Sequence, residues 1–228
     1  MLPKGQAANV LQLFDDRPHL HDAWDFDHSY ERTKWEPNAA ESMEVIERGP
    51  VRAVVRVVRK TERSTITQDI TLYASSSRID FVTKVDWREK HVLMKVAFPV
   101  DVRASNATYE IQYGTIERPT HHSTAADRGK YENTALRWVD LSEGNYGVSL
   151  LNDCKYGHDV RENVLRLSLL RSSIDPDPAA DQAMPRRAGR QPPGGGRRRM
   201  IVMVMMSHSG KNKKQKFKYQ SISDPLEG

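Results

Sequence analysis

The chain has 228 residues, enough for one ordinary domain or two small ones. Its 35 basic and 30 acidic residues give a formal charge of +5. Residues 183–228 hold 11 of the basic and two of the acidic residues, so they carry +9 and leave −4 for residues 1–182. The basicity belongs to the end of the chain and does not indicate an anionic partner for the rest. A single cysteine, Cys154, excludes an internal disulfide framework and a cysteine-based zinc finger.

No segment has the character of a membrane span or an export signal. Residues 1–10 lack the apolar stretch of a signal peptide. The longest wholly apolar run, residues 200–206, is far shorter than the roughly 20 residues that cross a bilayer. We therefore expect a soluble protein of a reducing compartment, located in the cytoplasm.

Residues 1–182 carry the alternation of apolar and polar side chains that is typical of half-buried β-strands. The alternation is clearest in residues 51–58, 79–87, 107–113 and 165–169, which are bounded by turn-forming residues. In the third of these stretches, Ala107, Tyr109, Ile111 and Tyr113 share the face that we expect to be buried. No stretch of similar length has helical periodicity. The pattern predicts an all-β fold, a large antiparallel β-sandwich.

The densest group of side chains that could bind a metal lies in residues 19–28. Imidazole and carboxylate groups together suit a divalent ion. Their spacing matches no fixed ligand motif, so we favour a surface segment in which polar residues surround a buried Trp24 and Phe26. We predict no metal site and no cofactor in this chain. The polar residues concerned are His19, His21, Asp22, Asp25, Asp27 and His28.

The composition changes near Gln182. Residues 175–178 read Asp-Pro-Asp-Pro, which interrupts the strand pattern because proline cannot donate a ladder hydrogen bond. Beyond them, residues 183–228 hold six of the 13 glycines and five of the eight methionines. We predict a domain over residues 1–182 and a disordered tail over residues 183–228, in which only residues 201–206 could form a short strand. The tail has few aromatic residues for base stacking, so nucleic acid is not an expected partner.

Four motifs between residues 9 and 182 carry a family resemblance. In their order they resemble the C-terminal β-sandwich region of glycoside hydrolase family 38 α-mannosidases, of the cytosolic and vacuolar type and its bacterial relatives. The resemblance ends near Gln182. The motifs are LQLFDDRP (11–18) leading to DAWD (22–25), DWRE (86–89) with KVAFP (95–99), residues 109–120 ending in ERPT, and WVDLSE (138–143) followed by YGVSLLNDCKYG (146–157).

The resemblance implies a galactose-mutarotase-like super-sandwich that belongs to a larger enzyme. Family members hydrolyse terminal α-linked mannose with retention, in an N-terminal catalytic domain that holds zinc. Nothing in this chain resembles that domain, so we expect the zinc to lie there and the chain alone to be inactive. The chain would scaffold and complete the active site, with the catalytic domain and a mannose-containing oligosaccharide as partners and no membrane. The parent enzyme would be cytoplasmic, or would lie in a vacuole or lysosome-like compartment.

Sandwich loops of such enzymes contribute to the rim of the active site, which implies rim residues here. Amide, carboxylate and ammonium groups can hydrogen-bond sugar hydroxyls, and tyrosine can stack on a sugar ring. A structural interpretation stays open, because Asn and Asp in turns also bond their own backbone. A non-catalytic carbohydrate-binding or interaction module is the alternative function. The rim candidates are Asn152, Asp153, Lys155 and Tyr156 in one loop, and Arg118 and His121 in another.

Overall fold

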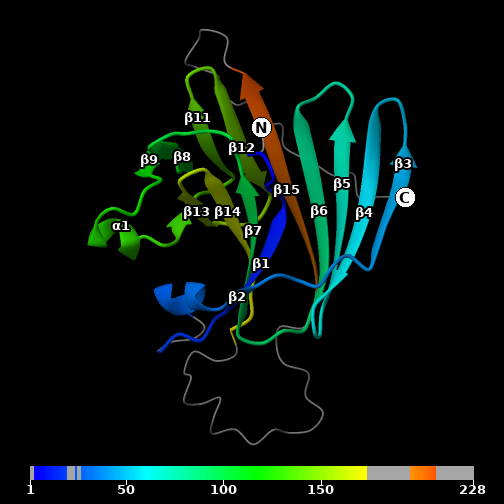
Figure 1. Cartoon of the computed structure of the whole chain (residues 1–228), viewed down its shortest axis with the longest axis horizontal. Helices are drawn as coiled ribbons and strands as arrows, with labels where there is room; N and C mark the ends of the chain where they lie inside the picture. The colour runs from blue at the N-terminus through cyan, green and yellow to red at the C-terminus, as the bar shows by residue number, and fades with distance from the viewer. Residues whose placement is uncertain (1–2, 20–23, 25–26, 174–195, 209–228) are drawn as a thin grey trace, which may run out of the picture.

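The computed structural model describes residues 3–19, 24, 27–173 and 196–208. Two antiparallel sheets face each other and enclose the core (Figure 1). This arrangement confirms the predicted all-β sandwich. In the described part of the chain, neither of the two short helices is long and apolar enough to cross a membrane.

The two sheets differ in width. Within the described residues, the smaller sheet has six strands, in the order β10 (Asn133–Thr134), β13 (Gly157–Arg161), β14 (Val164–Arg171), β7 (Val92–Pro99), β1 (Val10–Asp15) and β2 (Lys34–Trp35). The larger sheet has nine within the same limits, in the order β3 (Ser42–Arg48), β4 (Arg52–Lys60), β5 (Thr65–Tyr73), β6 (Arg78–Trp87), β15 (Gly196–His208), β12 (Tyr146–Asn152), β11 (Trp138–Glu143), β8 (Asn106–Ile111) and β9 (Gly114–Pro119). The helices are the 3-10 helix η1 (His28–Arg32) and the α-helix α1 (Ala125–Gly129).

The predicted alternation is visible in the strands. In β14, Leu165, Leu167 and Leu169 are buried in the core, while Arg166 lies on the opposite face of the strand. Tyr113 is an exception, because it was expected on the buried face and is fully exposed. It lies in the turn between β8 and β9 and has a φ of 61°, since the chain reverses there within two residues.

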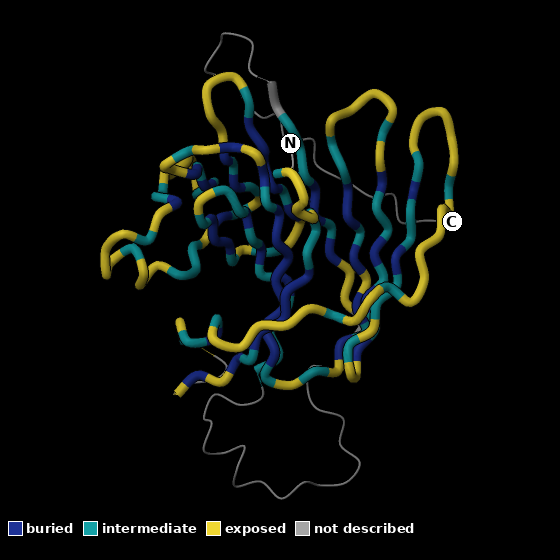
Figure 2. The backbone as a smooth tube through the Cα atoms, in the orientation of Figure 1, coloured by how far each residue is buried: buried dark blue, intermediate teal, exposed yellow. Residues whose placement is uncertain are grey.

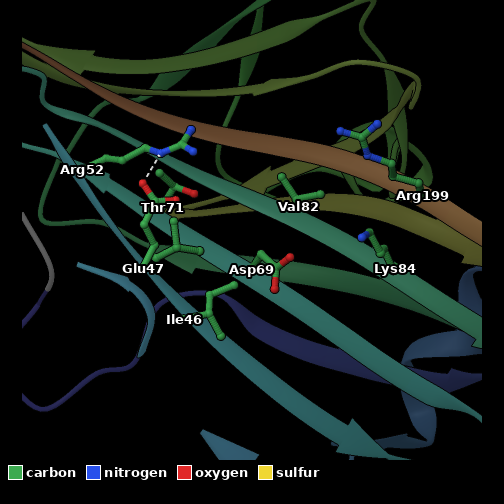
Figure 3. A pocket seen from close by; sticks show the side chains of 9 residues that line it. Ile46, Glu47, Arg52, Asp69, Thr71, Val82, Lys84 and Arg199 are labelled. Atoms are coloured by element: carbon green, nitrogen blue, oxygen red, sulfur yellow. Dashed lines mark hydrogen bonds and ion pairs between the residues drawn. The ribbon is translucent and has the colours of Figure 1, made fainter. Parts of the chain in front are cut away.

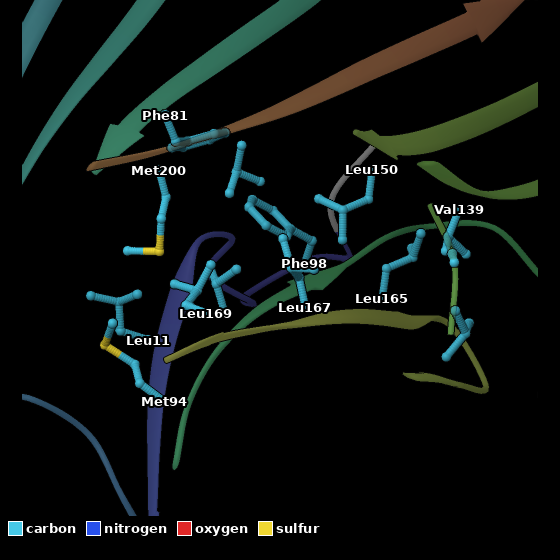
Figure 4. Packing of buried hydrophobic residues seen from close by; sticks show 14 of the residues in the cluster. Leu11, Phe81, Met94, Phe98, Val139, Leu150, Leu165, Leu167, Leu169 and Met200 are labelled. Atoms are coloured by element: carbon cyan, nitrogen blue, oxygen red, sulfur yellow. The ribbon is translucent and has the colours of Figure 1, made fainter. Parts of the chain in front are cut away.

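The core lies between the sheets and draws on both (Figure 4). Phe81 and Met200 extend from the larger sheet, and Phe98 and Leu167 from the smaller one. The rings of Phe81 and Phe98 meet across the gap, with centroids 5.4 Å apart. Each of these four side chains is buried, so burial of apolar surface from both sheets stabilises the sandwich.

Strand β15 is longer than the short strand that the sequence allowed at residues 201–206 of the tail. It lies between β6 and β12 and pairs with both along most of its length. Met200 and Val202 face the core, and Met203 is buried on the outer face of the sheet. The apolar run from Met200 to Met206 lacks the alternation of a half-buried strand, because residues on both of its faces are buried or half-buried. Gly196 and the three arginines that follow it gave no strand signal. Residues 183–195 and 209–228 lie outside the described residues.

Candidate functional site

The first group of candidate residues lies in the loop that joins the two sheets, between β12 and β13. Asn152 is buried at the start of this loop. Its Oδ1 accepts hydrogen bonds from the backbone N–H groups of Cys154 (3.1 Å) and Lys155 (2.5 Å). Its Nδ2 lies 3.4 Å from the carbonyl oxygen of Arg137 and 3.4 Å from Nε2 of His158. The amide thus uses its donors and acceptors to shape the loop, which leaves none for a sugar hydroxyl.

The rest of this loop is fixed through its backbone. Asp153 binds β15 twice, since its N–H donates to the carbonyl of Ile201 (3.3 Å) and its Oδ1 accepts from the N–H of Ile201 (3.1 Å). The carbonyl of Tyr156 accepts from the N–H of Ala135 (3.0 Å). The side chain of Tyr156 is left free to contact a ligand, because the residue is 59% exposed. Lys155 beside it is half-buried.

The second group lies at the end of β9, which contains Arg118, and in the segment after it, which contains His121, beside α1 (Figure 1). The guanidinium of Arg118 lies over the ring of Tyr109, 5.4 Å from its centroid. Its Nε is buried and has no hydrogen-bond partner among the described residues. His121 is exposed, and its Nδ1 lies 3.1 Å from Oγ of Ser123. Both candidates line one small pocket, together with Pro119, His122, Asp127, Lys130, Asn133, Asp159 and Val160.

Strand β10 connects the two groups. Asn133 of β10 lines the small pocket. The N–H of Ala135, just beyond the strand, donates a hydrogen bond to the carbonyl of Tyr156. Of the candidates, Asp153, Tyr156 and His121 are exposed, and Lys155 and Arg118 are half-buried. The pocket and the contact with Ala135 place both groups along the β10 edge of the smaller sheet. The two loops were proposed separately from the sequence, and the structure brings them to the same edge.

A larger groove lies elsewhere, on the outer face of the larger sheet (Figure 3). Its charged lining includes Arg52, which donates to Oε1 of Glu47 at 2.8 Å. The remaining lining residues are Ile46, Val54, Asp69, Thr71, Val82, Lys84 and Arg199. None of the lining residues is aromatic, so the groove offers no platform on which a sugar ring could stack. We therefore favour the β10 edge as the candidate site.

Comparison with known proteins gives the family. The sequence model of the glycosyl hydrolases family 38 C-terminal domain matches residues 1–179. The chain belongs to this family. The match confirms the resemblance that the four motifs indicate.

Curated relatives agree with this assignment. Alpha-mannosidase 2C1 of Homo sapiens is 42% identical over 182 residues, which cover 79% of this chain and 18% of the relative. Alpha-mannosidase G of Dictyostelium discoideum is 41% identical over 182 residues, covering 78% of this chain and 17% of the relative. An α-mannosidase of Enterococcus faecalis V583 shares the fold, with a TM-score of 0.68 at 14% identity over 88% of this chain and 26% of that chain. This family 38 domain thus spans less than a fifth of the length of these curated relatives.

A buried ionic network supports the candidate edge of this family 38 domain. Asp159 of β13 accepts from Nζ of Lys95 at 2.7 Å and from Nε of Arg166 at 2.5 Å. Lys95 also binds Glu132, in the segment between α1 and β10, and Arg166 reaches Glu31 of η1 at 2.8 Å. Burial alone would raise the pKa of Asp159, but the charges of Lys95 and Arg166 outweigh it and lower that pKa below its usual value. The network fastens η1 and the α1 segment to the outer face of the smaller sheet, and no sequence motif indicated it.

The described part of this family 38 domain holds no ligand set that fits the zinc which the resemblance implies for the catalytic domain. Among residues 3–19, 24, 27–173 and 196–208, no three His, Cys, Asp or Glu side chains gather to hold a metal ion. Oδ1 of Asp27 instead caps η1 by accepting from the N–H of Ser29 at 3.1 Å, and it lies 2.7 Å from Nδ1 of His28. Trp24, predicted to be buried, is 77% exposed because it lies in a turn outside both sheets. His21, Asp22, Asp25 and Phe26 lie outside the described residues.

His158 was not singled out from the sequence, although it supports the Tyr156 loop. Burial lowers its pKa from 6.5 to about 4, so the ring is neutral at pH 7. Nδ1 lies 3.0 Å from the carbonyl oxygen of Tyr156, which can only accept, so the proton lies on Nδ1. Nε2 is then left to accept from the amide of Asn152. The only sequence feature that could have indicated this role is the position of the histidine within a buried strand.

This burial predicts a pH-dependent stability. The unfolded chain binds a proton at His158 near pH 6.5 and the folded domain only near pH 4, so stability is full above pH 6.5 and falls as the pH drops. We expect the free energy of unfolding to be lower at pH 4.5 than at pH 7 by on the order of 2 to 3 kcal/mol. Urea denaturation at both pH values measures this difference. The variant His158→Gln should show a much smaller difference, and an equal difference in both proteins would contradict the assignment.

Proposed function

We propose that this domain forms the C-terminal part of an α-mannosidase that hydrolyses terminal α-linked mannose in glycans. The match of the family 38 C-terminal domain over residues 1–179 carries the proposal, and the relatives at 41–42% identity are named as α-mannosidases. In such an enzyme the domain scaffolds the catalytic domain and completes the rim of its active site. We expect that catalytic domain to supply the residues that hold the zinc.

The β10 edge is the part of the domain that we propose to meet the sugar. Tyr156 offers an exposed ring that can stack on the apolar face of a mannose unit. Lys155 can donate to a hydroxyl group, and the half-buried guanidinium of Arg118, at the end of β9, carries further N–H donors. Asn152 and His158 are buried and fix the loop by hydrogen bonds to its backbone, so we assign them no contact with the sugar.

The proposal is tested in a fusion that supplies the missing part. The segment of human Alpha-mannosidase 2C1 that precedes its matching region is joined to residue 1 of the full 228-residue chain. We expect the fusion to hydrolyse an aryl α-mannoside and the chain alone to leave it intact. Tyr156→Ala should lower kcat/KM in the fusion by about ten-fold, equivalent to ~1.4 kcal/mol of transition-state binding.

Tyr113→Ala is the matched control, because Tyr113 is an exposed tyrosine in a turn outside the candidate edge. It should leave kcat/KM unchanged. A folded but inactive fusion would contradict the proposed function. Saturable calorimetric binding of a mannose oligosaccharide by the isolated chain, lost in Tyr156→Ala, would instead favour a carbohydrate-binding module.

A further inference from the structure

The larger sheet extends beyond the smaller one and leaves part of its inner face uncovered. Strands β3 and β4, with the end of β5, lie at the far side of the sandwich, and the exposed colour dominates β3 (Figure 2). The apolar residues of this surface, which we name the overhang face, are Met43, Val45, Ala53, Val55 and Leu72. Met43 is 67% exposed, Val45 44% and Leu72 49%. Single exposed apolar residues are ordinary, but a contiguous apolar group marks a contact surface.

Strand pairing places these residues on one face. Val45 lies opposite Val55, and Ala53 lies opposite Leu72. Val55 in turn lies opposite Ile70, which packs against the hydrophobic core. Because side chains on one face of a sheet line up across paired strands, the overhang face continues the surface of the core out to the edge. It is core-like apolar surface that the smaller sheet does not reach.

The edge of the sheet itself is protected against pairing with another strand. Strand β3 has a β-bulge between Val45 and Glu47, and it carries Glu44, Glu47 and Arg48. Bulges and charges on an edge strand are the usual means by which proteins prevent edge-to-edge association. These features disfavour a second copy added at β3, and they leave the face, rather than the edge, as the surface to be covered.

The start of the chain indicates what covers it. Ala8 packs against the core, and Nδ2 of Asn9 donates to Oε1 of Gln68 at 3.1 Å. Gln68 lies on β5 directly opposite Val57, and Met43 of the overhang face lies on the other side of Val57. The segment that leads into β1 is therefore anchored beside the overhang face. The curated relatives are more than five times longer than the region they share with this chain, and a polypeptide that precedes residue 1 would arrive at this place.

We propose that the overhang face is the docking surface for the catalytic domain that precedes this domain in the enzyme. The inference rests on the proposed function, which supplies the partner. The partner surface is expected to be apolar opposite Met43, Val45 and Leu72, and to offer acidic or polar groups at the margins, because Arg48 and Arg59 lie on the same face of the sheet. Docking there would bury Met43, Val45 and Leu72, which this domain leaves in water.

The fusion described above tests the surface with a matched pair of substitutions. Met43→Glu combined with Val45→Glu places two charges on the overhang face, and Ile116→Glu places one on the opposite edge strand, β9. Val45 and Ile116 are similarly exposed, at 44% and 38%. Urea denaturation of the isolated chain should show that every variant still folds. In the fusion, we expect the double variant to unfold in two separate transitions and to be cleaved between the domains at least about ten-fold faster.

The outcomes separate the docking surface from the proposed function. If the unchanged fusion is active and unfolds in one transition, and the double variant does the same, the overhang face is not the docking surface while the proposed function stands. If the unchanged fusion is folded but inactive, both are overturned. Dimerisation of the isolated chain that the double variant abolishes, measured by sedimentation, would assign the face to a second copy and overturn the proposal. Ile116→Glu should unfold in one transition and resist cleavage between the domains, like the unchanged fusion.

Discussion

A chain that ends at residue 195 is expected not to fold. Removing β15 leaves β6 and β12 without a common neighbour, and their ladder hydrogen bonds on that side are lost. Three buried side chains, Met200, Val202 and Met203, disappear from the sheet. At about 1.5–3 kcal/mol for each fully buried side chain, the loss is roughly 5–9 kcal/mol, comparable to the whole stability of a typical domain. Circular dichroism and heteronuclear NMR spectra of the truncated chain would measure the loss of structure.

A chain that ends at residue 208 is the matched control. It keeps every described strand and removes the five lysines among residues 211–218. We expect its thermal midpoint to lie within a few degrees of that of the full chain. Cooperative unfolding of the shorter chain, 1–195, would show that β15 is dispensable and would contradict the sheet order.

The variant Asp159→Ala is expected to lose about 3–5 kcal/mol of stability, because it leaves Lys95 and Arg166 in a buried place without their shared partner. The side chain of Lys95 is fully buried, so water cannot replace the carboxylate. The free energy of unfolding from urea denaturation measures the loss.

Two further variants test this explanation. Asp86→Ala removes an exposed carboxylate that pairs with Arg88 and should cost less than about 1 kcal/mol. The double variant Lys95→Met with Asp159→Leu should be more stable than Asp159→Ala alone, because it removes a buried charge together with its partner. A loss in Asp159→Ala no larger than that in Asp86→Ala would show that the network contributes nothing to stability.

The sandwich could be predicted from the sequence because most of its strands are half-buried. In β14, leucines alternate with polar residues, and this period identifies both the strand and its buried face. In β15 this period is absent, since the run from Met200 to Met206 is apolar on both faces. Only residues 201–206 were therefore expected as a short strand, within a segment rich in charges and glycines. The average composition of a long segment predicts its structure only when all of its residues are similarly exposed or buried.

The candidate site could also be predicted from the sequence only in part. Residue type pointed to the loop at residues 152–156, and Tyr156 is exposed there. The amide of Asn152 could hydrogen-bond a sugar hydroxyl, but its Oδ1 already accepts hydrogen bonds from nearby backbone N–H groups. The network around Asp159 could not be predicted, because Glu31, Lys95 and Glu132 come from segments far apart in the sequence and each resembles an ordinary surface charge.

The position of β15 in the larger sheet also governs when the fold can form. On one side of it lie β3 to β6, and on the other lie β12, β11, β8 and β9. The strand that joins these two halves is the last described element to leave the ribosome. Until residue 208 has emerged, β6 and β12 expose unpaired edges, and the nascent chain is at risk of aggregation. Closure then requires contacts between residues more than 110 positions apart, such as Val202 with Phe81, so we expect folding to be slow and to finish only after synthesis of the strand.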